Sequence, residues 1–244
     1  MAEQNRPNNG LKTLLDRAQR VVFFGGAGVS TASGIPDYRS KGGLYDSDDA
    51  LPPEMILSHT YFMRHPDAFY DFYRTNMLHL DAQPNDAHRA LAHLEARGNL
   101  SAIVTQNIDG LHQKAGSRQV FELHGSAWRN SCMSCGAPFD VRDIVAGSGV
   151  PHCTCGGIIK PDVVLYEEQL DDEVVFGAIE AIAGADVLIV GGTSLAVYPA
   201  ASMVRYFEGD DLILINRDPT DYDSLATLII RDPIDVVLRD AVMR

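Results

Sequence analysis

The strongest constraint on the fold is a short apolar run, Val21 to Phe24, that ends abruptly in the segment Gly25-Gly26-Ala27-Gly28. Before this run, apolar residues recur at helical spacing: Leu11, Leu14, Leu15 and Ala18. An uninterrupted apolar run bounded by turn-forming residues is typical of a buried strand. The pattern therefore predicts a helix, a buried strand and a glycine loop in succession.

The middle of the chain repeats this alternation of helices and strands. Pro66 can begin an aromatic helix that runs to about residue 80. Asn85 is suited to cap a helix that continues through Arg97, and Gly98 is suited to end it. Leu100 to Thr105 then supplies the next strand.

Two further strands are expected nearer the C-terminus. Asp186 to Val190 is apolar, ends in Gly191-Gly192-Thr193-Ser194, and precedes a helix from about Tyr198. Leu212 to Ile215 is a similar run that ends at Asn216. Strands that alternate with helices predict an α/β fold with a doubly wound parallel sheet, whose ligands lie at the carboxyl ends of the strands. We therefore expect the strand ends to converge on one crevice.

The glycine loop after the first strand is a candidate phosphate site. Bare backbone N–H groups and a helix N-terminus in the segment Gly26 to Thr31 could hold the phosphates of a dinucleotide. The dehydrogenase fingerprint requires a third glycine where this chain has Thr31, so a hydride-transferring enzyme is disfavoured. A tight turn that binds nothing is the alternative.

All four cysteines lie in one stretch, from Gly125 to about Pro161, that interrupts the alternation and resembles an insertion. They form the pattern Cys132-x2-Cys135 followed by Cys153-x-Cys155. Four thiolates satisfy tetrahedral zinc without leaving an open position, which predicts a structural metal site rather than a catalytic one. Unliganded buried thiols or a redox pair are the alternatives.

Composition restricts the class of partner. The net charge of −13 opposes direct binding to nucleic acid or to an anionic membrane surface. The segment 1–9 has no apolar core, and no stretch approaches the length of a membrane span. These features predict a cytoplasmic protein with neither a nucleic-acid nor a membrane partner, and they leave the oligomeric state open.

Six short motifs occur in a fixed order along the chain. They are Ser33 to Ser40 (SGIPDYRS), Thr105 to His112 (TQNIDGLH), Leu123-His124-Gly125, Lys160 to Val164 (KPDVV), Gly192 to Leu195 (GTSL) and Ile215-Asn216. In this combination the chain resembles the sirtuin family. The resemblance implies a Rossmann-like domain from residues 1–37, 84–124 and 162–244. It also implies a small domain made of a helical module, 38–83, and a zinc module, 125–161.

The resemblance implies that NAD binds as a co-substrate and meets an acetyl-lysine side chain of a protein or peptide between the domains. The NAD contacts that it implies are Gly26, Ala27, Gly28, Thr31, Tyr38, Arg39, Gln106, Ile108, Asp109, Gly192, Thr193, Ser194, Asn216 and Ile234. Of these, Tyr38, Ile108 and Asp109 would form the nicotinamide pocket. Tyr38 stands where the family usually has phenylalanine, and the ring is expected to preserve the aromatic lid.

The catalytic residues implied by the resemblance are His124 and Asn107. The acetyl oxygen of the substrate would attack the ribose, and His124 would deprotonate a ribose hydroxyl, a task that suits a group titrating near pH 7. The function expected is NAD-dependent protein-lysine deacetylation. Protein ADP-ribosylation and non-catalytic NAD sensing are the alternatives.

The apolar run Val163-Val164-Leu165 resembles the family's strand for pairing with the substrate backbone. Glu167 replaces the usual glycine, which we expect to alter the preference for flanking residues. Family members that remove acidic acyl groups carry a Tyr-x-x-Arg pair, but here Tyr70 is followed by Tyr73, with Arg74 one position later. An uncharged acyl group is therefore favoured, unless a register shift brings Arg74 into the pocket.

Overall fold

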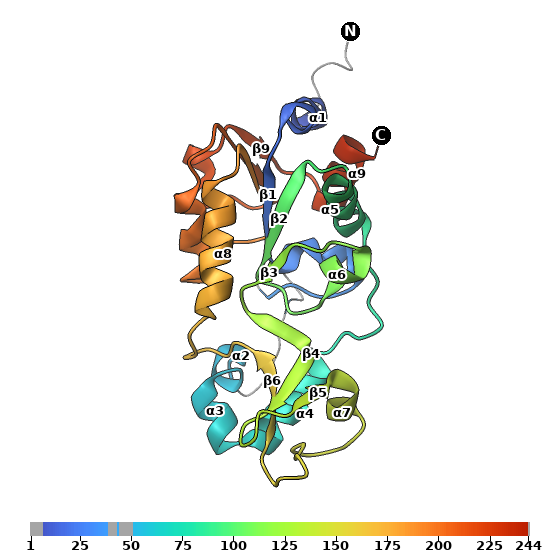
Figure 1. Ribbon diagram of the computed structural model, residues 1–244, viewed down its shortest axis with the longest axis vertical. Coiled ribbons are helices and arrows are strands. Elements are labelled where there is room, and N and C mark those ends of the chain that lie inside the picture. Colours follow the sequence, from blue (N-terminus) through green and yellow to red (C-terminus); the bar gives the residue numbers. More distant parts are fainter. Residues whose placement is uncertain (1–6, 39–42, 44–50, 244) are drawn as a thin grey trace.

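A computed structural model describes residues 7–38, 43 and 51–243, and it shows a parallel sheet flanked by helices above a smaller unit (Figure 1). The sheet runs in the order β3-β2-β1-β7-β8-β9 with every neighbouring pair parallel. Its strands are β1 (Val21–Gly25), β2 (Leu100–Thr105), β3 (Val120–Glu122), β7 (Val187–Gly191), β8 (Asp211–Ile215) and β9 (Leu228–Ile230). This is the strand order of a dinucleotide-binding fold, which confirms the predicted doubly wound sheet.

Helices cover both faces of the sheet (Figure 1). One face carries α1 (Pro7–Arg17), α5 (Asp86–Ala96), α6 (Leu111–Ala115) and α9 (Ile234–Val242), and the other carries α8 (Asp172–Ala183) and η4 (Ala200–Tyr206). Val21 and Phe23 pack into the first core, while Val22 and Phe24 pack into the second, because successive side chains of a strand point to opposite faces. None of the described helices is long and apolar enough to cross a membrane.

The smaller unit lies beyond the carboxyl ends of the strands (Figure 1). It contains α2 (Pro53–Ile56), α3 (His59–Arg64), α4 (Pro66–Asn76) and α7 (Val141–Val145), with an antiparallel sheet of β4 (Gly125–Cys132), β5 (Pro138–Asp140) and β6 (Ile159–Val163). Its core joins the aromatic side chains of α4 to Cys132, Cys153 and Val163. The cysteine stretch and the aromatic helix therefore share one hydrophobic core.

The helix start at Asn85 follows the predicted chemistry, because the Asn85 side chain accepts from the N–H of Ala87 and His88 completes a capping box. Two other helices expected from the sequence differ from those in the structure. The glycine loop continues as the short 3-10 helices η1 (Ala27–Val29) and η2 (Thr31–Ser33), so no α-helix begins there. The helix expected from about Tyr198 is also of the 3-10 type, within η4.

Candidate active site

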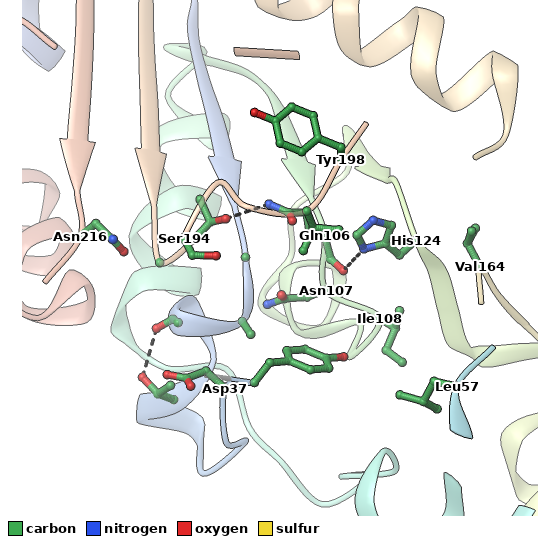
Figure 2. Close-up of a pocket in the computed structure, with 18 of the residues that line it drawn as sticks. Asp37, Leu57, Gln106, Asn107, Ile108, His124, Val164, Ser194, Tyr198 and Asn216 are labelled. Carbon is green, nitrogen blue, oxygen red and sulfur yellow. Dashed lines mark hydrogen bonds between the residues drawn. The ribbon is translucent and has the colours of Figure 1, made fainter. Parts of the chain in front are cut away.

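The ends of the parallel strands and the smaller unit enclose a cavity of about 390 Å³ (Figure 2). Most of the predicted NAD-binding, catalytic and substrate-binding residues line it: Gly26, Ala27, Gly28, Thr31, Tyr38, Gln106, Asn107, Ile108, His124, Val163, Val164, Leu165, Gly192, Thr193, Ser194, Asn216 and Ile234. They come from segments after β1, β2, β3, β7 and β8, from β6 and the residues that follow it, and from the start of α9. The convergence expected from the sheet topology is therefore observed.

Asp109 lies in a second, smaller cavity of about 60 Å³ beside the first. Ala27, Tyr38 and Ile108 are among the residues that line both. The three predicted nicotinamide residues thus lie close together, with Asp109 in the wall of the smaller cavity. Arg39, the remaining predicted NAD contact, lies outside the described residues.

Glycines allow the turns after β1 and β7 to pack against each other. A Cβ on Gly28 would lie 2.8 Å from the Cα of Gly192, and Gly192 itself has a φ of +60°. The N–H of Gly28 donates to the carbonyl of Gly192 at 2.8 Å, and that of Gly26 donates to the carbonyl of Gly191. The expectation that these amides are bare is therefore wrong for both glycines, whose backbones instead fix the shape of the loop.

A chain of hydrogen bonds orients the polar groups between the two cavities. The Nδ2 of Asn107 donates to Ser30 Oγ at 3.1 Å, and Ser30 Oγ donates to Asp109 at 2.6 Å. The second carboxylate oxygen of Asp109 accepts from the N–H of Leu111 at 2.9 Å. Ser30 was missed by sequence reasoning because its partners lie far away along the chain, and only its place in the glycine loop hinted at a role.

His124 lies between β3 and β4 and faces the main cavity (Figure 2). Its Nδ1 lies 3.0 Å from the carbonyl oxygen of Gln106, which can only accept, so the proton belongs on Nδ1. Nε2 of the neutral ring is then left with a lone pair. Burial lowers the pKa of His124 from its usual value of 6.5, partly opposed by the Gln106 carbonyl, so the ring is neutral at pH 7 and can accept a proton.

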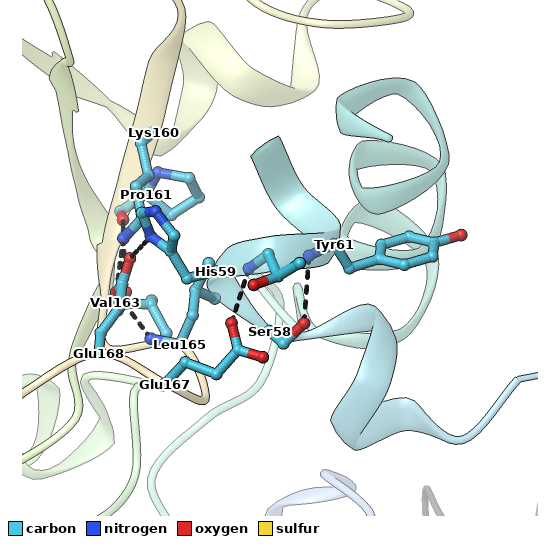
Figure 3. A network of polar contacts seen from close by, with 10 residues as sticks. Ser58, His59, Tyr61, Lys160, Pro161, Val163, Leu165, Glu167 and Glu168 are labelled. Atoms are coloured by element: carbon cyan, nitrogen blue, oxygen red, sulfur yellow. Dashed lines mark hydrogen bonds and ion pairs between the residues drawn. The ribbon is translucent and has the colours of Figure 1, made fainter. Parts of the chain in front are cut away.

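The predicted substrate-binding run is held from both sides, and Figure 3 shows the side of Glu168. The N–H of Val164 donates to the carbonyl of His124 at 3.0 Å. The carboxylate of Glu168 accepts from the N–H of Leu165 at 2.9 Å and from Lys160 Nζ at 3.0 Å, and it lies 2.9 Å from Nδ1 of His59. Glu168 therefore connects the run to α3, a role that sequence reasoning missed because its partners are dispersed.

Glu167 adopts a left-handed conformation with a φ of +75°. That conformation explains why glycine is usual at this position, since a residue with a Cβ is strained there by about 1 kcal/mol or more. The Glu167 carboxylate accepts from the N–H of Thr60 at 2.8 Å and lines the rim of the cavity. An effect on flanking-residue preference remains a prediction.

The four cysteine sulfurs lie within 4.8 Å of one another. The Sγ atoms of Cys132 and Cys155 are 3.4 Å apart, and those of Cys135 and Cys153 are 3.7 Å apart. Ligands about 2.3 Å from a tetrahedral zinc ion are separated by about 3.8 Å, so this set fits the metal. The described residues offer no fifth ligand or open position in this group, which suits a structural ion.

The short Cys153-x-Cys155 spacing is accommodated by a tight turn. The N–H of Cys153 donates to the carbonyl of Gly157, and that of Gly156 donates back to Cys153. Gly156 has a φ of +86°, and a Cβ on Gly157 would lie 2.8 Å from the Cys132 sulfur. The two glycines thus let both thiols reach the cluster.

Tyr70 and Arg74, the residues considered for binding an acidic acyl group, make hydrogen bonds outside the cavity. The guanidinium of Arg74 donates to the carbonyls of Ile144 and Gly149 at 2.8 and 2.7 Å, and the Tyr70 hydroxyl donates to the carbonyl of Ile159. Neither residue lines the cavity. The register shift that would carry Arg74 into the pocket is therefore not observed.

Comparison with known proteins agrees with this arrangement. The Sir2 family profile matches residues 26–199. An NAD-dependent protein deacetylase of Clostridium acetobutylicum is 55% identical over 238 residues, which are 96% of this chain and 97% of that protein. A solved Sir2 structure with a deacetylated p53 peptide and 3′-O-acetyl ADP-ribose is 36% identical, with a TM-score of 0.88 and 96% of each chain covered. Another, of Sir2 with a p53 peptide and NAD+, is 37% identical, with a TM-score of 0.82 and 93% of each chain covered. By sequence and by structure, the chain belongs to the Sir2 family.

Proposed function

We propose that this protein is an NAD-dependent protein-lysine deacetylase that transfers the acetyl group of acetyl-lysine to ADP-ribose. The observation that carries the proposal is a neutral His124, with an unprotonated Nε2, in the cavity that also holds Asn107. The Clostridium relative bears this activity in its name, and the Sir2 complex contains both expected products, a deacetylated peptide and an acetylated ADP-ribose.

The cavity fits NAD by the chemistry of its lining. Small residues and hydroxyls at the ends of β1 and β7 suit phosphates and riboses, and Asn216 and Ile234 at the far side suit the adenosine end. Asp109 is placed to accept from the nicotinamide carboxamide, with Tyr38 and Ile108 beside it. When bound, NAD supplies the ribose that accepts the acetyl group.

The chain's own residues then supply orientation and proton transfer. Ser30 holds the Asn107 amide and the Asp109 carboxylate in fixed directions, which lowers the cost of ordering them around the ligand. His124 takes a proton from a ribose hydroxyl through Nε2, while the Gln106 carbonyl stabilises the charged imidazolium that results.

Acetyl-lysine peptides bind along Val163 to Leu165 by β-addition. Zinc on the four cysteines stabilises the smaller unit.

The proposal includes a Rossmann-like domain of 1–37, 84–124 and 162–244, a helical module of 38–83 and a zinc module of 125–161. The core shared by α4 and the cysteine stretch supports the pairing of the two modules. A cytoplasmic location is also part of the proposal, because zinc-binding thiolates need a reducing compartment.

The test is to incubate the protein with an acetylated peptide and NAD labelled in its adenine. We expect deacetylated peptide and nicotinamide to form together, with the label in small molecules. Label retained on protein would favour ADP-ribosylation, and tight NAD binding without turnover would favour a sensing module; either result would contradict the proposal.

Deacetylase activity is expected to be lost on the acid side only at a pH below the usual pKa of histidine. Because burial lowers the pKa of His124 below 6.5, the ring remains a base until the pH falls under that value. The acid limb of measured kcat/KM for acetyl peptide should therefore have its midpoint below pH 6.5. An acid limb with a midpoint above pH 7 would contradict this assignment.

Replacement of Glu168 is expected to weaken binding of the peptide but not of NAD. In Glu168→Gln the negative charge is lost, so the bond from Lys160 Nζ is weakened even when the amide oxygen takes the place of the carboxylate oxygen that accepts from both Lys160 and the N–H of Leu165. We expect the peptide KM to rise about tenfold, which corresponds to about 1.4 kcal/mol, with the NAD KM within about twofold of the wild type.

The exposed carboxylate of Glu180 on α8 provides the control variant, Glu180→Gln, which should leave both constants unchanged. Equal changes in the two KM values of Glu168→Gln would indicate a general loss of structure and would overturn the positioning role.

A further inference from the structure

The chain's single tryptophan, Trp128, lies in the wall of the smaller cavity, beside Asp109. Its Nε1 donates to the backbone carbonyl of Asp109 at 2.8 Å. The indole also lies directly against Gly110, where an added Cβ would be 2.9 Å from Nε1 and where φ is +70°. Glycine meets both requirements, because it has no Cβ and adopts a positive φ without strain. The indole is therefore seated on the peptide that joins Asp109 to Gly110.

Trp128 acts together with its neighbour on β4. The N–H of Ala127 donates to the carbonyl of Ile108 at 3.0 Å, so two successive residues of β4 hold two successive carbonyls of the loop after β2. β4 leads from the end of β3 into the smaller unit and ends at Cys132 (Figure 1). The loop is thus tied to a strand whose far end lies in the cysteine cluster.

The hydrogen bond from Trp128 complements those that hold the Asp109 side chain. Ser30 Oγ and the N–H of Leu111 each donate to one oxygen of the carboxylate. These bonds fix the direction of the side chain, whereas Trp128 fixes the backbone that carries it. The indole has a single N–H donor, which the Asp109 carbonyl occupies, so Trp128 has no polar group left for a ligand.

We propose that Trp128 is a positioning residue for the nicotinamide end of NAD. Its N–H holds the backbone of Asp109 in the place from which the carboxylate accepts from the carboxamide. Trp128 lies outside the six sequence motifs. The inference rests on the proposed function and adds to its site a residue that acts through Asp109.

The test compares Trp128→Phe, which keeps a ring but has no donor, with Trp128→His. The five-membered ring of histidine can place its Nε2–H where the indole has Nε1–H, and the imidazole is neutral at about pH 8. In Trp128→Phe we expect the NAD KM and the inhibition constant of nicotinamide each to rise about fivefold, the usual worth of one hydrogen bond. Trp128→His should recover most of this loss. The peptide KM of both variants should stay within about twofold of the wild type.

Unchanged NAD and nicotinamide constants in Trp128→Phe would overturn the inference, and so would equal losses in the two variants, which would point to ring volume alone. A rise in the peptide KM as large as that in the NAD KM would show a general structural effect and would also overturn it. Calorimetry of NAD binding makes the same comparison of the three proteins without turnover. If the wild type binds NAD but deacetylates no peptide, the proposed function fails, and the calorimetric comparison decides the role of Trp128.

The fluorescence of the single tryptophan provides a measurement on the wild type that needs no variant. NAD should change the emission of Trp128 more than ADP-ribose, which lacks only the nicotinamide. Equal responses to saturating NAD and ADP-ribose would show that nicotinamide does not reach the region of Trp128, and would overturn the inference.

Discussion

Replacing His124 with glutamine is expected to reduce kcat/KM for deacetylation by about 10²–10⁴-fold, the usual contribution of a positioned general base. Glutamine keeps a polar side chain at this position but cannot accept a proton at neutral pH. Because the base acts after nicotinamide has left, peptide-dependent exchange of labelled nicotinamide into NAD should persist in His124→Gln. Steady-state deacetylation and the exchange assay, run on the same preparation, measure the two steps separately.

The control for this variant is His93→Gln, which changes an exposed histidine on α5 that is not among the residues lining the cavity. It should retain wild-type deacetylation and exchange. Deacetylation by His124→Gln within about threefold of the wild type would contradict the assignment of the base. Loss of exchange together with deacetylation would contradict its timing.

Loss of the zinc site is expected to disable the enzyme through its structure rather than its chemistry. Cys132 and Cys153 belong to the core that also contains Tyr73 and Val163 of the cavity wall. Structural zinc contributes about 10–16 kcal/mol of apparent binding energy in small zinc modules, and loss of even about 4 kcal/mol would lower Tm by about 8–16 °C here. Cys135→Ser should therefore bind little zinc, melt at least about 8 °C lower and lose most of its deacetylase activity.

Thr154→Ser is the matched control, because Thr154 is exposed between two of the cysteines and the hydroxyl is retained. It should bind zinc in the same amount as the wild type. Zinc content by mass spectrometry, Tm and activity are measured on each protein. A zinc-free Cys135→Ser with the wild-type Tm and activity would show that the cysteines do not stabilise this unit.

Local patterns predicted the layered part of the fold well. The run Leu100 to Thr105 forms a strand with the expected bounds, and Asn85 caps the helix that was expected from it. In these places the apolar period, the cap and the terminating glycine all favour the same structure, and tertiary packing did not override them. The helices after β1 and near Tyr198 were less predictable, because propensity alone does not distinguish short 3-10 turns from α-helix.

The sequence motifs indicated which segments meet in the cavity but not how their side chains are held. Ser30 joins Asn107 to Asp109, and Glu168 joins the substrate-binding run to α3, through contacts that link residues remote in the chain. No local spacing marks such contacts, since they exist only once the strands have aligned.

The most direct test of the central claim follows the acetyl group itself. A peptide with a radiolabelled acetyl-lysine is incubated with the protein, with and without NAD, and the products are separated at early times. We predict that the label appears on ADP-ribose, that nicotinamide and deacetylated peptide form in equal amounts, and that no label leaves the peptide without NAD. Label released directly as free acetate, or deacetylation without NAD, would contradict the account.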